Sequence, residues 1–163
     1  YPPAYGAREI IQKYKISETG EEISLDVLQK IVSIYQERLK KLSEISELTD
    51  FFFRDKLEYD KNLLKWEEIS EKEIFLSLDK LEKILSKIDT GAWTKENLEN
   101  ILIPEAEKLA EDIGKVGDRG YLLWPLRVAL TGKEASAGPF EIAELLGKER
   151  ALKRIKEAKE KLK

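Results

Sequence analysis

Hydrophobic residues recur at intervals of three and four along most of this 163-residue chain, which is the spacing of one face of an α-helix. The clearest case begins after Ser24, a residue suited to cap a helix. Its apolar positions are Leu28, Ile31, Val32, Tyr35, Leu39 and Leu42. No stretch alternates apolar and polar residues as a strand does, and no hairpin dipeptide joins two apolar runs. The pattern therefore predicts an all-α fold.

Two further helices are predicted from their capping residues. Ser70 and Thr94 each precede an apolar run with helical spacing, and Trp93 stands just before the second cap. Pro104 is expected either to bend the second of these helices or to open a new one. A charged, weakly periodic stretch over residues 54–65 indicates the connection between two small helical subdomains, which we place at residues 1–68 and 69–163.

Residues 124–154 predict three short helices with sharp ends. Pro125 suits the first turn of a helix, where its missing N–H costs nothing, and Gly132 can end that helix in the left-handed conformation. Pro139 starts the next helix, Gly147 ends it, and a third begins at Lys148. From the pattern alone, this region is a compact helical core with basic residues facing solvent.

Composition narrows the class of protein and the chemistry it can perform. With 42% hydrophobic and 37% charged residues, the chain is expected to be globular and soluble rather than disordered. No apolar run approaches the roughly 20 residues that span a bilayer, so no membrane partner is expected. The absence of Cys and His removes disulfides, the commonest general base and the commonest metal ligand. Because the sequence has no Met and starts at Tyr1, we expect it to be a piece of a longer protein.

The charge is distributed unevenly. The whole chain carries −3, yet residues 115–156 contain nine Lys or Arg and only five Asp or Glu. Such asymmetry is expected when one face of a protein meets phosphate groups. No phosphate-binding loop of the GxxxxGK[ST] type is present, and no carboxylate pair stands out among the many charged helix positions. The sequence therefore predicts a binding function and no active site of its own.

Three segments carry a resemblance to a known family: ERLKKL at residues 37–42, WPLRVALTG at 124–132 and SAGPFEIAELLGKERALKR at 136–154. Together they resemble the C-terminal, anticodon-binding end of bacterial-type glutamyl-tRNA synthetases. The resemblance implies two helical subdomains that form a cage around the anticodon loop of tRNA(Glu), in a cytoplasmic enzyme. It also implies that the catalytic domain, with its HIGH-like and KMSKS-like motifs, its ATP and its magnesium, lies upstream in the same polypeptide. No cofactor is then expected in this chain.

The resemblance gives two arginines roles in reading the anticodon. Arg38 matches the arginine that contacts the third anticodon base, where a guanidinium can donate to the acceptor edge of cytosine. Arg127 matches the arginine that faces the anticodon, and its expected place in a first helical turn would set it beside unpaired N–H groups. The alternatives are an ordinary surface arginine for Arg38 and a structural salt bridge for Arg127.

Residues 136–140 match the family segment that wraps the first anticodon base with backbone groups and apolar side chains. The candidates here are Ser136, Ala137, Pro139 and Phe140. The chain departs from the family pattern, with Ala137 in place of proline and Pro139 in place of leucine, which puts the apolar contact of that leucine in doubt. For Phe140 the alternative is packing in the core.

The remaining candidates are basic residues that could follow the phosphate backbone. Arg150, Lys153 and Arg154 share one helical face at spacings of three and four, and a solvated helix face is the alternative. Lys115 and Arg119 are candidates on similar grounds, with less support. The competing function for the whole chain is a helical protein-interaction module that docks on an acidic partner and has no RNA ligand.

Overall fold

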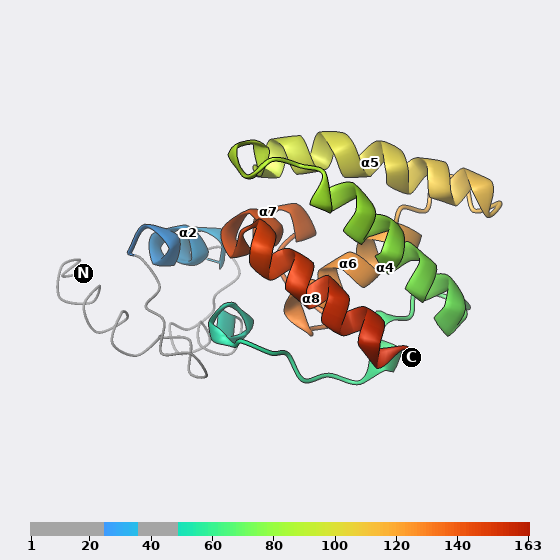
Figure 1. Ribbon diagram of the computed structural model, residues 1–163, viewed down its shortest axis with the longest axis horizontal. Coiled ribbons are helices and arrows are strands. Elements are labelled where there is room, and N and C mark those ends of the chain that lie inside the picture. The colour runs from blue at the N-terminus through green and yellow to red at the C-terminus, as the bar shows by residue number, and fades with distance from the viewer. Residues whose placement is uncertain (1–24, 36–48) are drawn as a thin grey trace. The chain divides into compact units, whose positions relative to one another are not determined.

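The computed structural model describes residues 25–35 and 49–163, and every regular element within these ranges is helical (Figure 1). The predicted all-α class is therefore confirmed. The chain divides into two compact units, Tyr1–Leu57 and Glu58–Lys163. Within the described ranges, no helix is both long and apolar enough to span a bilayer.

The first unit contains α2 (Leu25–Tyr35) and the short 3-10 helix η3 (Asp50–Phe53). Leu28 and Ile31 are buried on the inner face of α2, and the expected cap residue, Ser24, lies outside the described residues. All three phenylalanines of η3 are buried, with the rings of Phe51 and Phe52 4.2 Å apart. A 3-10 helix turns once in about three residues, so three adjacent buried side chains mean that η3 is enclosed on every side.

The second unit contains five α-helices and two 3-10 helices. In chain order they are η4 (Lys61–Leu64), α4 (Glu71–Ser86), η5 (Thr90–Ala92), α5 (Lys95–Asp112), α6 (Gly120–Thr131), α7 (Pro139–Leu146) and α8 (Lys148–Lys161). Ser70 Oγ accepts from the N–H of Glu73 at 3.3 Å, and Thr94 Oγ1 accepts from Asn97 at 3.2 Å, so both predicted caps are confirmed. Pro104 lies inside α5, which continues past it as one helix.

The helix at the centre of this unit is α6, which packs against α4, α5, α7, α8 and η4. Leu122, Leu126 and Leu130 are buried on one side of α6, and Tyr121 and Val128 are buried on another. A helix that is apolar on most sides belongs inside a bundle, where the other helices cover it. This central position explains why the apolar run around residues 121–131 has no polar face.

The boundary between the units lies earlier in the chain than the predicted one. Residues 58–68 belong to the second unit, where Leu64 is fully buried and the indole of Trp124 donates to the carbonyl of Leu63 at 2.8 Å. The rings of Trp66 and Trp124 also lie 5.2 Å apart. This segment is held by tryptophan contacts rather than by a helical stripe, so its periodicity does not reveal that it belongs to a core.

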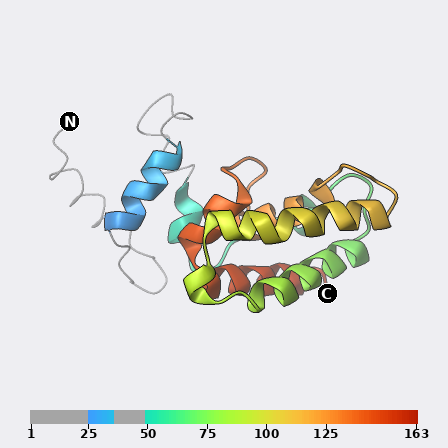
Figure 2. The same cartoon turned by 90° about the horizontal axis from the view of Figure 1, so that it is seen from above.

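The second unit has two distinct ends (Figures 1 and 2). At one, the α7 end, α7 lies close to the starts of α5 and α8; Lys95 Nζ meets Glu141 Oε1 at 3.0 Å, and Lys148 Nζ donates to the carbonyl of Ser86 at 3.0 Å. At the other, the α5–α6 end, the turn of residues 113–119 joins α5 to α6. The candidate residues are divided between these two ends.

Candidate nucleic-acid interface

Arg127 is the eighth residue of α6, because this helix begins at Gly120 rather than at Pro125. Asp118 Oδ1 accepts from the N–H of Gly120 at 2.9 Å and so begins the helix early. Pro125 therefore lies inside α6, and the expectation that it opens the helix is wrong. Arg127 is correspondingly far from the unpaired N–H groups of a first turn, so it does not act together with a helix N-terminus.

The guanidinium of Arg127 instead fixes the loop that follows its own helix. Nη1 donates to Ser136 Oγ at 3.1 Å, and Nη2 donates to the carbonyl of Glu134 at 2.7 Å. The guanidinium carbon also lies 4.7 Å from the ring centroid of Trp124, within the range of a cation–π contact. One side chain thus holds residues 134 and 136 against α6. Its guanidinium thus makes hydrogen bonds to a hydroxyl and a carbonyl.

Two further features fix the start of this loop. Gly132 ends α6 with φ 66°, which confirms the predicted left-handed stop, and its N–H donates to the carbonyl of Val128 at 2.7 Å. Thr131 Oγ1 donates to the carbonyl of Arg127 and accepts from the N–H of Lys133 at 3.1 Å. The loop of residues 132–138, which we call the pinned loop, is therefore held at both ends.

The pinned loop leads into α7, which starts at Pro139 as predicted. Ala137 is 0% exposed and Phe140 9% exposed, so both side chains belong to the core. For Phe140 the core-packing alternative is the correct one, and the expected apolar contact of these two side chains with a base is not available on the surface. Ser136 and Pro139 are half-buried, so backbone groups and these smaller side chains form the accessible part of the segment.

The basic residues of α8 do not share one exposed face. Arg154 is only 2% exposed and donates to the carbonyl of Leu130 at 2.5 Å, so its guanidinium supports the end of α6 from inside the unit. The expectation that Arg154 follows phosphates is wrong, because a buried side chain cannot reach them. Lys153 is exposed and lies 3.7 Å from Glu157, while Arg150 is half-buried in the first turn of the helix.

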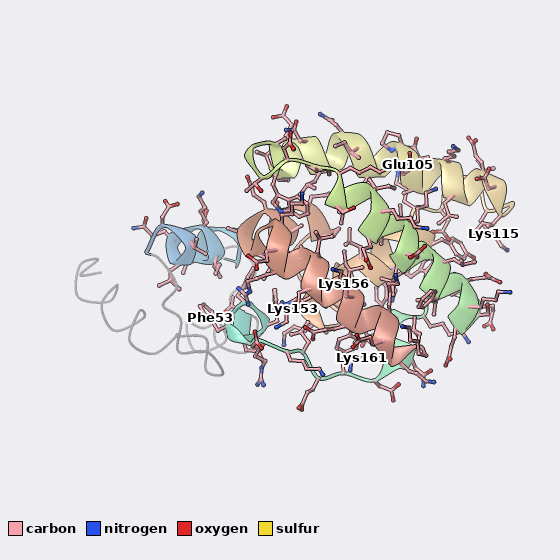
Figure 3. The ribbon with its side chains drawn as sticks, in the orientation of Figure 1. Phe53, Glu105, Lys115, Lys153, Lys156 and Lys161 are labelled. Atoms are coloured by element: carbon pink, nitrogen blue, oxygen red, sulfur yellow. The ribbon has the colours of Figure 1, made fainter. Side chains whose placement is uncertain are left out.

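Lys115 and Arg119 lie at the α5–α6 end, away from the pinned loop, and Figure 3 shows Lys115 beyond the end of α5. Arg119 Nη2 is 2.6 Å from Glu107 Oε1, so its charge is largely compensated. Lys115 lines a cleft together with Glu67, Glu73 and Asp118. These acidic surroundings disfavour a phosphate contact at this end. Arg38, the predicted reader of the third base, lies outside the described residues.

Sequence reasoning missed the two tryptophans that support the site. The guanidinium of Arg127 lies over the ring of Trp124, and Trp66 packs against Trp124. The spacing of Trp124 and Arg127, three residues apart in a predicted helix, was the available signal, because side chains at this spacing are neighbours. The contact of Trp66 depends on a chain separation of more than fifty residues and has no local signal.

Comparisons with known proteins agree on one family. Residues 7–159 match the family described as "Anticodon binding domain". The chain is 37% identical over 142 residues to a glutamate–tRNA ligase of Clostridium kluyveri, covering 86% of this chain and 27% of that protein. It is 30% identical over 160 residues to glutamate–tRNA ligase 2 of Rubrobacter xylanophilus, covering 96% of this chain and 30% of that protein.

A solved structure is similar in fold as well. The crystal structure of a glutamate tRNA ligase from Elizabethkingia meningosepticum, in complex with its amino acid, superposes with a TM-score of 0.69 at 26% identity. The match covers 96% of this chain and 30% of that one. The chain thus spans less than a third of the length of the proteins it resembles here.

Proposed function

Because this chain belongs to the anticodon binding domain family, we propose that it binds the anticodon loop of a tRNA, and that this tRNA is tRNA(Glu). The polypeptide to which it belongs would be a glutamate–tRNA ligase, working in the cytoplasm. The ATP, the magnesium and the glutamate would then be used in a catalytic domain elsewhere in that polypeptide. The role of this chain is recognition and positioning, so that the acceptor end of the tRNA reaches the remote active site.

The observation that carries the proposal is the pinned loop. RNA loops are read by groups that stack on splayed bases or hydrogen-bond their edges. Arg127 holds the backbone at Glu134 and the hydroxyl of Ser136, while its own guanidinium lies over Trp124. Fixing the loop in the free protein removes part of the ordering cost of binding.

The pinned loop is also close to basic residues that could add affinity independent of sequence. The bond from Arg154 to Leu130 joins α8 to the end of α6, just before the loop begins. Lys133 lies in the loop, and Lys148, Arg150 and Lys153 lie in the first two turns of α8. Contacts of this kind with phosphates position the RNA, whereas contacts with base edges provide specificity.

A binding measurement on tRNA(Glu) tests this proposal. We expect affinity to fall steeply as salt rises, because each phosphate contact releases bound counterions. Arg127→Gln should weaken binding about tenfold, since it releases the loop and removes a charge. Lys72→Gln is the matched control: it also removes one positive charge, but from an exposed position in the first turn of α4, in the part of the second unit away from α7.

Equal affinity of Arg127→Gln and Lys72→Gln would show that the pinned loop does not take part in binding. No binding of any tRNA at low salt would contradict the proposal as a whole and favour the protein-interaction module. The indole N–H signal of Trp93, which reports its bond to the carbonyl of Ala143 at 2.8 Å, checks that each variant is folded.

A further inference from the structure

A cleft of about 450 Å³ opens at the α5–α6 end of the second unit, away from the pinned loop. Four carboxylates line it, from Glu67, Glu68, Glu73 and Asp118, together with the single ammonium group of Lys115. Its volume lies in the range of small-molecule sites, which is roughly 300–1,000 Å³. The proposed binding of tRNA does not use this cleft, because its carboxylates would repel phosphate.

The carboxylates of the cleft are not neutralised by neighbouring cations. In the part of the chain that the structure describes, no Lys or Arg forms an ion pair with Glu67, Glu68 or Glu73, and Lys115 has none either. Asp118 accepts from the indole of Trp66 at 3.0 Å and from the N–H of Gly120 at 2.9 Å, so it is held in place by neutral donors. The cleft is therefore a concentrated and uncompensated negative site.

A tyrosine whose ring is mostly enclosed also lines this cleft. Tyr121 is only 7% exposed, it lines the cleft, and its hydroxyl has no hydrogen-bond partner among the described residues. The hydroxyl is not sealed from solvent, and its pKa is raised by burial and by the charges of Asp118, Glu67 and Glu73. Those three carboxylates line the same cleft as Tyr121. The hydroxyl is therefore available to bond a group that enters the cleft.

The floor and rim of the cleft are suited to a ligand with an apolar part. Ile69 and Ile113 line it beside the ring of Tyr121. Glu67 has a φ of 55°, an unfavourable conformation for a residue other than glycine, and such strain is often found at binding sites. The cleft thus combines aliphatic and aromatic surface with acceptors for a positive charge.

We propose that this cleft binds an alkylammonium group, with its nitrogen between Glu73, Asp118 and the hydroxyl of Tyr121 and its methylene chain against Ile69 and Ile113. The ammonium donates to the carboxylates and to the phenol oxygen. The same chemistry is offered by a free aliphatic amine and by the side chain of a lysine in a polypeptide. This site is independent of the RNA-binding surface.

The test is a titration of the 163-residue chain followed by the indole N–H signals of its tryptophans. The probes are pentylamine, Nα-acetyl-lysine methylamide and, as a neutral control of the same length, pentanol. Trp66 should respond, because its N–H donates to Asp118 in the cleft, whereas Trp93, whose N–H donates to Ala143, should not. A response to pentylamine alone identifies a free amine as the ligand, and a response to the lysine derivative identifies a side chain.

Two variants and one control test which residues of the cleft bind the ammonium group. Glu73→Gln should raise the Kd of the responding amine about tenfold, because it removes a negative charge that attracts the ammonium. Tyr121→Phe should raise it about threefold, because it removes one hydrogen bond. Glu96→Gln, which removes an exposed carboxylate in the first turn of α5, should leave the Kd unchanged. All three should bind tRNA(Glu) as the unaltered chain does, so this inference and the proposed function fail separately. Equal binding of pentanol, no response of Trp66 to either amine, or an unchanged Kd in both cleft variants would overturn it.

Discussion

Single tryptophans join segments that are far apart in the chain. The indole N–H groups of Trp66, Trp93 and Trp124 donate to Asp118, Ala143 and Leu63, across separations of 52, 50 and 61 residues. An indole has a large apolar surface and one donor, so when buried it both packs and needs a particular acceptor. These three bonds hold residues 58–68 and α7 to the rest of the second unit.

The packing of Trp66 leaves no room for a side chain at Gly120. A Cβ at this position would lie 2.2 Å from Cε2 and 2.4 Å from Nε1 of Trp66, and the backbone of Gly120 needs no left-handed conformation. Gly120→Ala should therefore lower the free energy of unfolding by about 1–3 kcal/mol, the usual cost of overpacking. Urea unfolding followed by fluorescence measures it. Gly91→Ala, where a Cβ meets nothing within 4 Å, is the matched control, and equal stability of the two variants would contradict this account.

Arg154 shows what a closer reading of the sequence could have found. The buried residues of α8 are Ala151, Arg154, Ile155 and Ala158, which have the spacing of a single inward-facing stripe. Arg154 thus occupies a core position, although it also shares a face with Arg150. The acceptor that stabilises its guanidinium, the carbonyl of Leu130, is 24 residues away and cannot be inferred from local spacing.

At the scale of elements, the helix starts at Ser70, Thr94 and Pro139 were as predictable as the helix ends, whereas the start of α6 was not. Gly132 and Gly147 end α6 and α7 as expected, because a positive φ, 66° and 85° here, is a local requirement that glycine meets most easily. The start of α6 was missed because it depends on Asp118 and on the fit of Gly120 beneath Trp66. The glycine that ends a helix can be recognised in the local sequence. A helix start that depends on a side chain far away in the chain cannot.

The contact between α4 and α8 depends on charge. Lys159 Nζ lies 2.8 Å from Asp79 Oδ1 and 3.2 Å from Glu82 Oε2, above the ring of Phe75. Hydrogen bonds from Lys159, and then from Lys83, lower the pKa of Asp79 from 3.8 to about 2. Because the folded-state pKa is the lower one, this stabilisation is fully present above pH 3.8 and is lost as pH falls toward 2.

The free energy of unfolding should therefore decrease less for Asp79→Asn than for the unaltered protein as the pH falls through this range. The measurement is urea unfolding at a series of pH values for the unaltered protein and the variant. Lys159→Gln should have a similar effect, and the double variant should add little to either, since both remove the same interaction. An unchanged pH dependence in Asp79→Asn would show that this carboxylate contributes nothing to acid sensitivity.

For the whole molecule, net charge is a poor guide to where RNA binds. The chain carries −3, and its basic C-terminal region includes both the pinned loop and Lys115, which opens into an acidic cleft. Folding separates these residues to opposite ends of the second unit, because α5 and α6 place the 113–119 turn away from α7. The fold class and most helices could be predicted from local patterns. The division of basic residues between two ends could not, because it depends on how the helices pack.

Specificity for the anticodon is the property that involves the whole molecule, since its expected reader, Arg38, belongs to the first unit and the pinned loop to the second. We expect Arg38→Gln to weaken the preference for cytosine over guanine at the third anticodon base roughly tenfold, because glutamine lacks the charge and the fork of donors. The measurement is binding of two tRNAs that differ only at this base. Arg127→Gln is the contrasting variant. It should weaken the binding of both tRNAs by the same factor, since its loop is proposed to contact another part of the anticodon. A cytosine-to-guanine ratio unchanged by Arg38→Gln would make Arg38 an ordinary surface residue and place the discrimination on another side chain.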